Sequence, residues 1–316
     1  MIDVAVRRGA DNIVGSPGAL HPAVRAALEQ MAGQPALETL TPDQARRLPQ
    51  PLDPAPEAVA AILQRSVPGP RGPIAIRSYR PAVEHPASLV YAHGGGFVIG
   101  GLDASDAFCR RLANATACTV SSVEYRLAPE HKFPAGLEDV YTAVGWVAER
   151  ASPGPLVVAG TSAGANLVAG ATLLARERGG PAVAMQVLVV PAMRFAAATE
   201  SHRAYGTGYG LDSATMEWFA RQYLSSEDEA DDPLVSPVLA DLRGMPPALV
   251  LTAEFDCLRD DGELYARRLR DAGGEATVIR YAGAIHGFVG LPDVPAARLA
   301  AEHIGTIVRA LLAELA

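Results

Sequence analysis

Residues 155–177 read PLVVAGTSAGANLVAGATLLARE, and three features follow one another within them. The apolar run PLVVAG predicts a buried strand, and the segment after Ser162 predicts an amphipathic helix. Between them Gly160 and Gly164 flank the serine in a G-x-S-x-G pattern. A sharp strand-to-helix turn of this kind lifts the serine hydroxyl above the sheet, beside the free N–H groups of the helix N-terminus. Alone, the pattern also fits a glycine-rich capping turn with a solvated serine, so the strand and the helix carry the inference.

Apolar strands alternate with helices on both sides of this stretch. After an edge hairpin within 65–80, strands are expected at 88–93, 118–125, 155–160, 183–190, 248–254 and 276–281. Helices are expected at 107–116, 136–151, 163–178, 261–272 and 294–315. Such alternation is typical of βαβ units, which build a parallel sheet with helices on both faces. We therefore expect an α/β protein with a mostly parallel, eight-stranded sheet.

Two segments interrupt this alternation. Residues 1–55 are helical in character and end in a cluster of prolines, and residues 191–235 carry Trp218, Phe219, Tyr223 and then an acidic run. Insertions in such sheets usually overhang the C-terminal strand ends, where ligands bind. Residues 191–235 are therefore expected to lie over that end of the sheet.

A second glycine-rich turn follows the strand expected at 88–93. It reads His93-Gly94-Gly95-Gly96-Phe97 and stands about 70 residues before the serine. Three consecutive glycines leave backbone N–H groups uncovered, which suits an oxyanion hole, although a flexible turn would explain the glycines equally well. The combination with G-x-S-x-G favours the oxyanion hole. Because His93 precedes the serine, against the chain order of this motif class, we expect it to hold the loop by hydrogen bonds.

An activated serine needs a general base. Downstream of Ser162 the histidines are His202, His286 and His303. His286 comes just after a strand, at the C-terminal edge of the sheet where the serine is expected. His202 falls in the insertion, and His303 falls in the expected terminal helix. We therefore predict that His286 is the base.

The base in turn needs an acid that orients it. The strand expected at 248–254 leads directly into three acidic residues, Glu254, Asp256 and Asp260. Glu254 takes the last position of the strand, and Asp260 is expected to begin the next helix as its cap. Asp256 is therefore the predicted acid. The resulting chain order of serine, aspartate and histidine is that of the α/β-hydrolases.

With these residues in hand, the chain resembles the hormone-sensitive lipase-like branch of the α/β-hydrolases, also called bacterial family IV esterases, over roughly residues 60–316. The motifs stand in the family's order: HGGGF at 93–97, YRLAPE at 125–130 with FPA at 133–135, GTSAG at 160–164, D-x-L-x-D at 256–260 and HGF at 286–288. The resemblance implies an α/β-hydrolase fold whose N-terminal segment and insertion form a helical cap. It divides the chain into a first cap segment (1–50), core (51–190), a second cap segment (191–235) and further core (236–316).

The resemblance also implies a role for each matching residue. The nucleophile would be Ser162, the acid Asp256 and the base His286, with an oxyanion hole made by the N–H groups of Gly94, Gly95 and Ala163. The YRLAPE block would pack behind the oxyanion loop. Thr161 stands where many members have Asp or Glu, which places the chain in a GTSAG subgroup. Ala165 replaces a usual glycine, and Cys257, expected to be packed rather than reactive, replaces a proline.

The implied reaction is hydrolysis of carboxylic esters without a metal or an organic cofactor. Bulky cap residues would close the pocket and favour short- to medium-chain acyl groups, with Phe97, Trp218 and Tyr223 as the candidate lining residues. An amidase or a carbamate hydrolase on the same triad is an alternative. Another is a non-catalytic small-molecule receptor, although the plant hormone receptors that resemble this family lack the histidine that stands here as His286.

Composition and charge argue against several other classes of protein. The net charge is −8 and no basic block is present, which disfavours a nucleic-acid or anionic-membrane partner. No apolar run approaches 18 residues, and the N-terminus lacks the apolar stretch of a signal peptide. The three cysteines are widely spaced, and no metal-ligand spacing is visible. We expect a cytoplasmic enzyme that acts on a small ester, with a homodimer as the assembly that the resemblance suggests.

Overall fold

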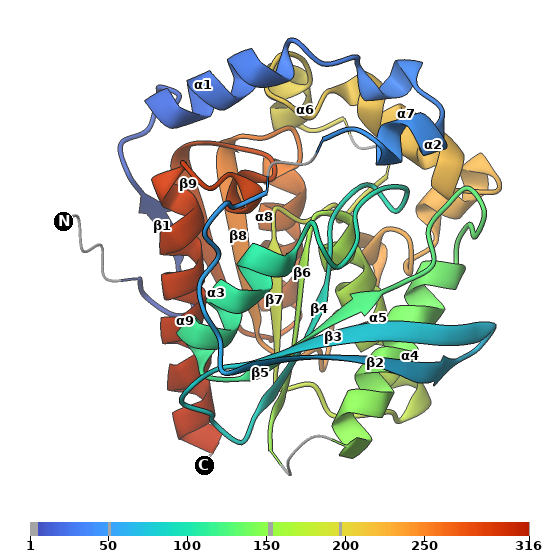
Figure 1. Ribbon diagram of the computed structural model, residues 1–316, viewed down its shortest axis with the longest axis vertical. Coiled ribbons are helices and arrows are strands. Elements are labelled where there is room, and N and C mark those ends of the chain that lie inside the picture. Colours follow the sequence, from blue (N-terminus) through green and yellow to red (C-terminus); the bar gives the residue numbers. More distant parts are fainter. Residues whose placement is uncertain (1–5, 50–51, 151–153, 196–197, 316) are drawn as a thin grey trace.

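A twisted sheet forms the centre of the computed structural model, which describes residues 6–49, 52–150, 154–195 and 198–315 (Figure 1). Within these residues the sheet has nine strands in the order β1-β9-β8-β7-β6-β4-β5-β3-β2. They are β1 (Asp11–Val14), β2 (Ala61–Gly69), β3 (Gly72–Arg80), β4 (Ser88–Ala92), β5 (Thr119–Glu124), β6 (Leu156–Thr161), β7 (Met185–Val189), β8 (Ala248–Phe255) and β9 (Ala276–Ile285). β3 pairs antiparallel with β2 and β5, and the other neighbours are parallel. The predicted α/β architecture is confirmed.

The expectation of eight strands is wrong by one, because the sequence analysis missed β1. This strand has four residues, too few for an alternating pattern to appear. It pairs in parallel with β9, where Asp11 lies opposite Val278. The side-chain amide of Asn12 strengthens the pairing by donating to the carbonyl of Val278 at 3.0 Å. The helical character assigned to residues 1–55 therefore applies only after this strand.

Helices cover both faces of the sheet (Figure 1). On one face lie α3 (Asp106–Thr116) and α9 (Pro295–Leu315), and on the other lie α4 (Ala135–Arg150), α5 (Ala163–Arg178) and α8 (Arg259–Asp271). Successive residues of a strand point to opposite faces. In β6, Val157 and Ala159 join the core beneath α3 and α9, whereas Val158 joins the core beneath α4 and α5. Burial on both faces explains why the parallel strands appear in the sequence as continuous apolar runs.

A further set of helices lies over the C-terminal ends of the parallel strands (Figure 1). The first cap segment supplies α1 (Pro22–Met31), η1 (Leu37–Thr39) and α2 (Pro42–Arg46), and the second supplies α6 (Glu200–Tyr205), α7 (Ser213–Tyr223) and η2 (Glu227–Asp231). Short 3₁₀ helices at η3 (Pro237–Leu239) and η4 (Phe288–Gly290) complete the elements. The hydroxyl of Thr215 donates to the carboxylate of Glu38 at 2.8 Å and joins the two cap segments. The domain limits at 190 and 235 stay predictions, and the limit between 50 and 51 lies outside the described residues.

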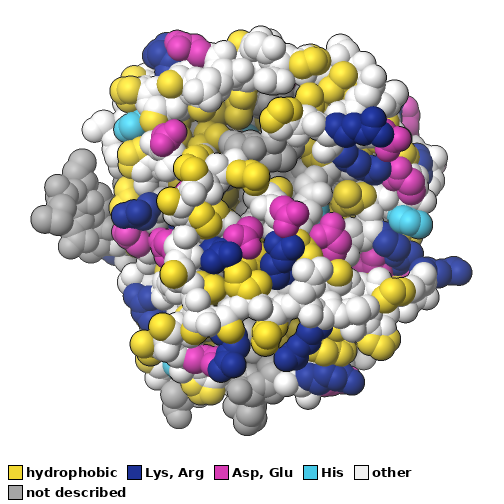
Figure 2. Space-filling model, viewed as in Figure 1, with side chains coloured by type: hydrophobic (Ala, Val, Ile, Leu, Met, Phe, Trp, Pro, Cys, Tyr) yellow, Lys and Arg dark blue, Asp and Glu magenta, His cyan; other side chains and the backbone are white. Residues whose placement is uncertain are grey.

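The surface carries mixed charge. Figure 2 shows acidic and basic side chains interspersed over one face, and a hollow below α1 that is edged by hydrophobic side chains. Across the described parts of the chain, no helix combines the length and the apolar character needed to cross a membrane.

Candidate active site

Ser162 lies at the turn between β6 and α5 in a backbone conformation that is rare for a residue with a side chain. Its φ is 56° and its ψ is −118°, and its N–H donates to the carbonyl of Val189 at 2.8 Å. The flanking glycines permit this turn. A Cβ on Gly160 would lie 2.3 Å from the carbonyl oxygen of Gly164, and one on Gly164 would lie 2.1 Å from that of Ala92. The motif therefore needs glycine at both positions for strand and helix to approach.

Three side chains form a hydrogen-bonded row at this turn. The Nε2 atom of His286 lies 2.9 Å from the Oγ of Ser162, and its Nδ1 lies 2.9 Å from the Oδ2 of Asp256. A carboxylate only accepts hydrogen bonds, so Nδ1 carries the proton and Nε2 is free to accept from the serine hydroxyl. The Asp256 side chain is completely buried, whereas that of His286 is 14% exposed. The arrangement can remove a proton from the serine and keep the resulting imidazolium next to a negative charge.

The loop after β8 determines which carboxylate reaches the histidine. Asp256 accepts the N–H of Leu258 on Oδ1 at 2.8 Å, which leaves Oδ2 for the imidazole. Glu254 points elsewhere and accepts the backbone N–H groups of Gly18 and Gly283, each at 2.8 Å. The geometry therefore places Asp256, not Glu254, beside His286.

The other two histidines downstream of Ser162 are hydrogen-bonded to residues outside the row. Nδ1 of His202 lies 2.9 Å from the hydroxyl of Thr199 in the cap, and Nδ1 of His303 lies 2.9 Å from the hydroxyl of Tyr281. Burial lowers the pKa of His202, against the influence of two nearby carboxylates. Within the described part of the chain, the imidazole hydrogen-bonded to Ser162 is that of His286.

The loop after β4 presents backbone donors to the serine. Within the described residues, the N–H groups of Gly94, Gly95 and Ala163 have no hydrogen-bond acceptor. A Cβ on Gly94 would lie 3.4 Å from the Cβ of Ser162, so this part of the loop lies directly against the serine. Gly95 has a φ of 115°, and a Cβ there would lie 2.1 Å from the carbonyl oxygen of Ile99. Uncovered N–H groups next to the serine can stabilise an oxyanion that forms there.

His93 holds this loop from behind. Its Nδ1 donates to the carbonyl of Gly94 at 2.7 Å, and its ring stacks on that of Tyr125 with centroids 4.3 Å apart. The hydroxyl of Tyr125 donates to the carbonyl of His93 at 2.8 Å. Burial lowers the pKa of His93 to about 4, so the ring is neutral at physiological pH. The predicted structural role of His93 is confirmed.

The YRLAPE block packs behind the loop, as predicted. The carboxylate of Asp139 accepts two hydrogen bonds from the guanidinium of Arg126, at 2.8 and 2.9 Å, and a third from its backbone N–H. The N–H of Ala128 donates to the carbonyl of Phe97 at 2.9 Å. Arg46 of α2 donates to both carboxylate oxygens of Glu130, which lowers the pKa of that carboxyl to about 2. The first cap segment is thereby attached to the YRLAPE block.

Aromatic side chains pack above the oxyanion loop. The rings of Phe97 and Tyr223 are nearly parallel with centroids 3.8 Å apart, and Phe195 lies about 6 Å from both. Trp218 is 5% exposed and makes an edge contact with Phe219 at 5.2 Å. The three aromatic residues predicted to line the pocket are thus buried near the loop, where Phe97 and Tyr223 contact each other and Trp218 contacts the neighbouring Phe219.

Comparison with protein families agrees with the fold and with the position of the three hydrogen-bonded residues. A family model described as alpha/beta hydrolase fold matches residues 89–290, which include Ser162, Asp256 and His286. The chain belongs to the α/β hydrolase fold family. The resemblance to the hormone-sensitive lipase-like branch, which rested on the motifs, is confirmed at the level of the family.

Characterised relatives of this α/β hydrolase are ester hydrolases. It is 43% identical over 252 residues to the carboxylic ester hydrolase LipN of Mycobacterium tuberculosis, a match that covers 75% of this chain and 67% of the relative. It is 40% identical over 225 residues to an arylesterase of Saccharolobus solfataricus, covering 69% and 73% of the two chains. A hyperthermophilic esterase from Pyrobaculum calidifontis superposes with a TM-score of 0.87 at 40% identity, over 93% of this chain and 99% of that one. The expected enzyme class, carboxylic ester hydrolase, is confirmed.

The sequence analysis of this hydrolase did not select Phe219 for the site. A Cβ on Gly96, the third glycine of the oxyanion loop, would lie 2.2 Å from the Phe219 ring, so the ring covers that glycine. A signal was available, because Phe219 stands four residues before Tyr223 and shares its helix face. Ser201, whose contacts are described below, carried no signal in the sequence.

A cavity of about 250 Å³ lies away from this site. It is lined by the connector at Leu52 and Asp53, by Asp106 and Arg111 of α3, and by Val289 after β9. None of the residues in the hydrogen-bonded row lines it, so we do not assign the substrate to it. No group of three metal-ligating side chains occurs among the described residues.

Proposed function

We propose that this carboxylic ester hydrolase works through an acyl-enzyme, with Ser162 as nucleophile, His286 as base and Asp256 as acid. His286 takes the proton of Ser162 as the serine oxygen attacks the ester carbonyl, and Asp256 stabilises the imidazolium that forms. The imidazolium then protonates the departing alcohol. Water repeats the sequence on the acyl-enzyme and releases the carboxylic acid. The observation that supports the proposal is the row of two 2.9 Å hydrogen bonds through one imidazole.

The tetrahedral oxyanion is proposed to bind the N–H groups of Gly94, Gly95 and Ala163. These donors are uncovered in the described chain, and Ala163 also begins helix α5, whose N-terminus carries partial positive charge. Preorganised donors of this kind account for a large share of the rate enhancement in acyl transfer. The uncovered donors and the hydrogen-bonded base support catalysis rather than ligand reception.

The proposed substrates are esters with short- to medium-chain acyl groups. Trp218, Phe219 and Tyr223 are buried side chains of a cap that packs closely on the oxyanion loop, and Phe97 is a buried side chain of that loop. A pocket of limited length gains about 0.8 kcal/mol for each methylene until it is full. Longer chains then lose binding energy through strain or exposure.

A burst assay tests the mechanism. With a p-nitrophenyl butyrate substrate, an acyl-enzyme predicts a rapid release of nitrophenol approaching one equivalent per active site when deacylation is the slower step. A phosphonate reagent should label Ser162 and abolish the burst, and peptide mass mapping identifies the serine. Labelling at another serine, or hydrolysis that survives full labelling of Ser162, would refute the mechanism.

Three finer assignments accompany this mechanism. Membership in the GTSAG subgroup is supported by Thr161, whose buried hydroxyl lies 2.9 Å from that of Tyr91, a site poorly suited to a carboxylate.

A cytoplasmic location is supported by three unpaired, buried cysteines, and cell fractionation would test it. A homodimer through a sheet edge is supported by the exposed Ile62 and Leu63 on edge strand β2, and light scattering would test it.

A further inference from the structure

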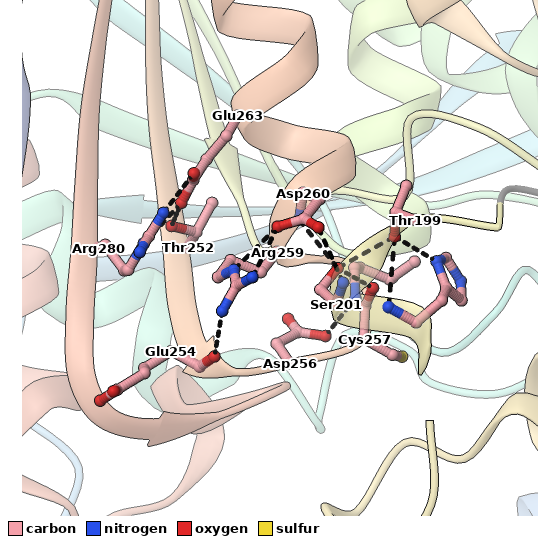
Figure 3. Close-up of polar contacts among 12 residues, drawn as sticks. Thr199, Ser201, Thr252, Glu254, Asp256, Cys257, Arg259, Asp260, Glu263 and Arg280 are labelled. Carbon is pink, nitrogen blue, oxygen red and sulfur yellow. Dashed lines mark hydrogen bonds and ion pairs between the residues drawn. The ribbon is translucent and has the colours of Figure 1, made fainter. Parts of the chain in front are cut away.

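Helix α6 of the cap contacts the loop that carries Asp256, and Ser201 makes the closest of these contacts. Its side chain is completely buried. The hydroxyl donates to the carbonyl of Cys257 at 2.7 Å and accepts the N–H of Asp260 at 3.2 Å. The backbone N–H of Ser201 donates to the carboxylate of Asp260 at 2.8 Å. Figure 3 shows Ser201 between Asp260 and Cys257, with Asp256 beside them.

Other groups of the second cap segment contact the same loop. The guanidinium of Arg259 lies 5.3 Å from the ring centroid of Tyr205, and the Tyr205 ring makes an edge contact with Phe255. The thiol of Cys257 donates to the carbonyl of Leu211 at 3.4 Å. Cap residues therefore contact the loop along its length, and the hydroxyl of Ser201 hydrogen-bonds to the loop backbone at two points.

These contacts bear directly on the geometry of Asp256. Cys257 is the next residue in the chain, so the hydrogen bond from Ser201 to its carbonyl restrains the backbone immediately after Asp256. The restraint at Asp260 holds the first turn of α8. Between these points, the Leu258 N–H orients the Asp256 carboxylate. A displacement of about 1 Å in such an arrangement can cost roughly 100-fold in rate.

We propose that Ser201 is a positioning residue: its hydroxyl uses the cap to hold the Asp256 loop so that the carboxylate reaches His286. The inference rests on the proposed role of Asp256 as the acid of the triad. The proposal gives the cap a second function besides enclosing the substrate. The packing of α6 against the loop keeps the Asp256 carboxylate in place for its hydrogen bond to His286. Ser201 itself touches none of the reacting groups.

The experiment compares Ser201→Ala with the wild type in kcat, KM and the pH profile of kcat/KM. We expect kcat to fall roughly 10- to 100-fold with KM nearly unchanged, because the Ser201 side chain is completely buried and has no surface for a substrate to contact. The acid limb of the profile should move to lower pH by about 0.5–1 unit, because a carboxylate held less closely stabilises the imidazolium less. Other titrating groups near the loop are His202, Asp260 paired with Arg259, and Asp261. Both proteins contain these groups, so the comparison with the wild type isolates the effect of Ser201.

Thr116 offers a matched control. Its buried hydroxyl also donates to a carbonyl at 2.7 Å, that of Leu112, and accepts an N–H at 3.2 Å, that of Cys118. Both partners lie in or just after α3, on a different face of the sheet from the cap contact. Thr116→Val should lower the free energy of unfolding comparably and leave kcat and the acid limb unchanged. A Ser201→Ala protein with wild-type kcat and acid limb would overturn the proposal.

Two further variants complete the design. Ser201→Cys keeps a weaker donor of similar size and should give intermediate values of kcat and acid limb; if only this variant folds, wild-type values in it would overturn the proposal. Asp256→Asn separates this inference from the mechanism on which it rests. An active Asp256→Asn enzyme would refute the triad and the inference together. An inactive Asp256→Asn enzyme beside a fully active Ser201→Ala enzyme would refute the inference alone.

Discussion

The ring of Phe219 in cap helix α7 covers the Cα of Gly96 in the oxyanion loop so closely that a Cβ on the glycine would lie 2.2 Å from the ring. Gly96 also has a φ of 57°, which favours a residue without a side chain. The cap and the loop that supplies the proposed oxyanion hole are therefore in direct contact, and a change on either side of this contact must reach the other.

We expect Gly96→Ala to lower kcat/KM roughly 10- to 100-fold, because the added methyl group either displaces Phe219 or moves the neighbouring donors. The double variant Gly96→Ala with Phe219→Ala removes the clash and should recover part of this loss, leaving the strain of the positive φ. Steady-state kinetics on p-nitrophenyl butyrate measure both effects. Full activity in Gly96→Ala would contradict the close contact between cap and loop.

Removal of the proposed nucleophile or base should nearly abolish activity. Ser162→Ala and His286→Ala should each lower kcat by roughly 10⁵–10⁶, and the double variant should be little worse, because the residues act as a unit. Asp256→Asn should cost roughly 10⁴. Glu254→Gln is the control, since the Glu254 carboxylate accepts the backbone N–H groups of Gly18 and Gly283; if this change proves more damaging than Asp256→Asn, the acid is wrongly assigned.

The rate should depend on the ionisation of a histidine. A base must be neutral to accept the serine proton, so kcat/KM should rise with pH as the base loses its proton. His93 should not contribute near neutral pH, because burial lowers its pKa to about 4. The profile is measured with substrate well below KM. Loss of activity in EDTA with recovery in zinc would instead indicate a metal-dependent mechanism.

Stability should depend on a buried carboxyl outside the triad. Both carboxylate oxygens of Asp261 are buried. Burial, with the nearby Asp256 charge, raises the pKa of Asp261 to about 8, although the backbone of Arg194 acts in the opposite direction. An unfolded aspartate ionises near pH 4, so the unfolded chain loses this proton first and the fold loses stability as pH rises from about 4 to 8.

Asp261→Asn removes that ionisation. Relative to the wild type, its free energy of unfolding should therefore improve between pH 5 and pH 8, by up to about 4 kcal/mol from linkage over three pH units. Urea unfolding at the two pH values measures the difference. Parallel pH dependence in the two proteins would show that Asp261 ionises normally in the fold.

Acyl-chain preference should be short to medium. In a series of p-nitrophenyl esters from acetate to palmitate, kcat/KM should peak at about four to eight carbons, because each methylene gains about 0.8 kcal/mol only until the pocket is full. Trp218→Ala should shift the peak toward longer chains. An optimum at twelve carbons or more, or a rate jump at the solubility limit of the substrate, would indicate a lipase. An unchanged chain-length profile in Trp218→Ala would show that Trp218 does not line the acyl pocket.

Local sequence determined much of this protein. The strand, the G-x-S-x-G turn and the helix around Ser162 are adjacent in the chain, and Gly160 and Gly164 are required by contacts within a few residues or with the neighbouring strand. The six inner strands β4 to β9 were predictable because burial on both faces imposes continuous apolar runs, whereas β2 and β3 were expected as an edge hairpin. Chain order and position after a strand also pointed to His286 and Asp256, since parallel strands bring their C-terminal ends to one edge.

Tertiary structure decided what depends on distant partners. Strand β1 exists because it pairs with β9, more than 250 residues away, and its four residues carry no pattern of their own. The irregular pairing at the end of β8, between Ala253 and Phe255, precedes the loop in which Asp256 and not Glu254 points to His286. Ser201 and Phe219 act on loops far from them in sequence. Their identities are ordinary for a cap helix, and only the packing of that helix against the core gives each of them a specific contact.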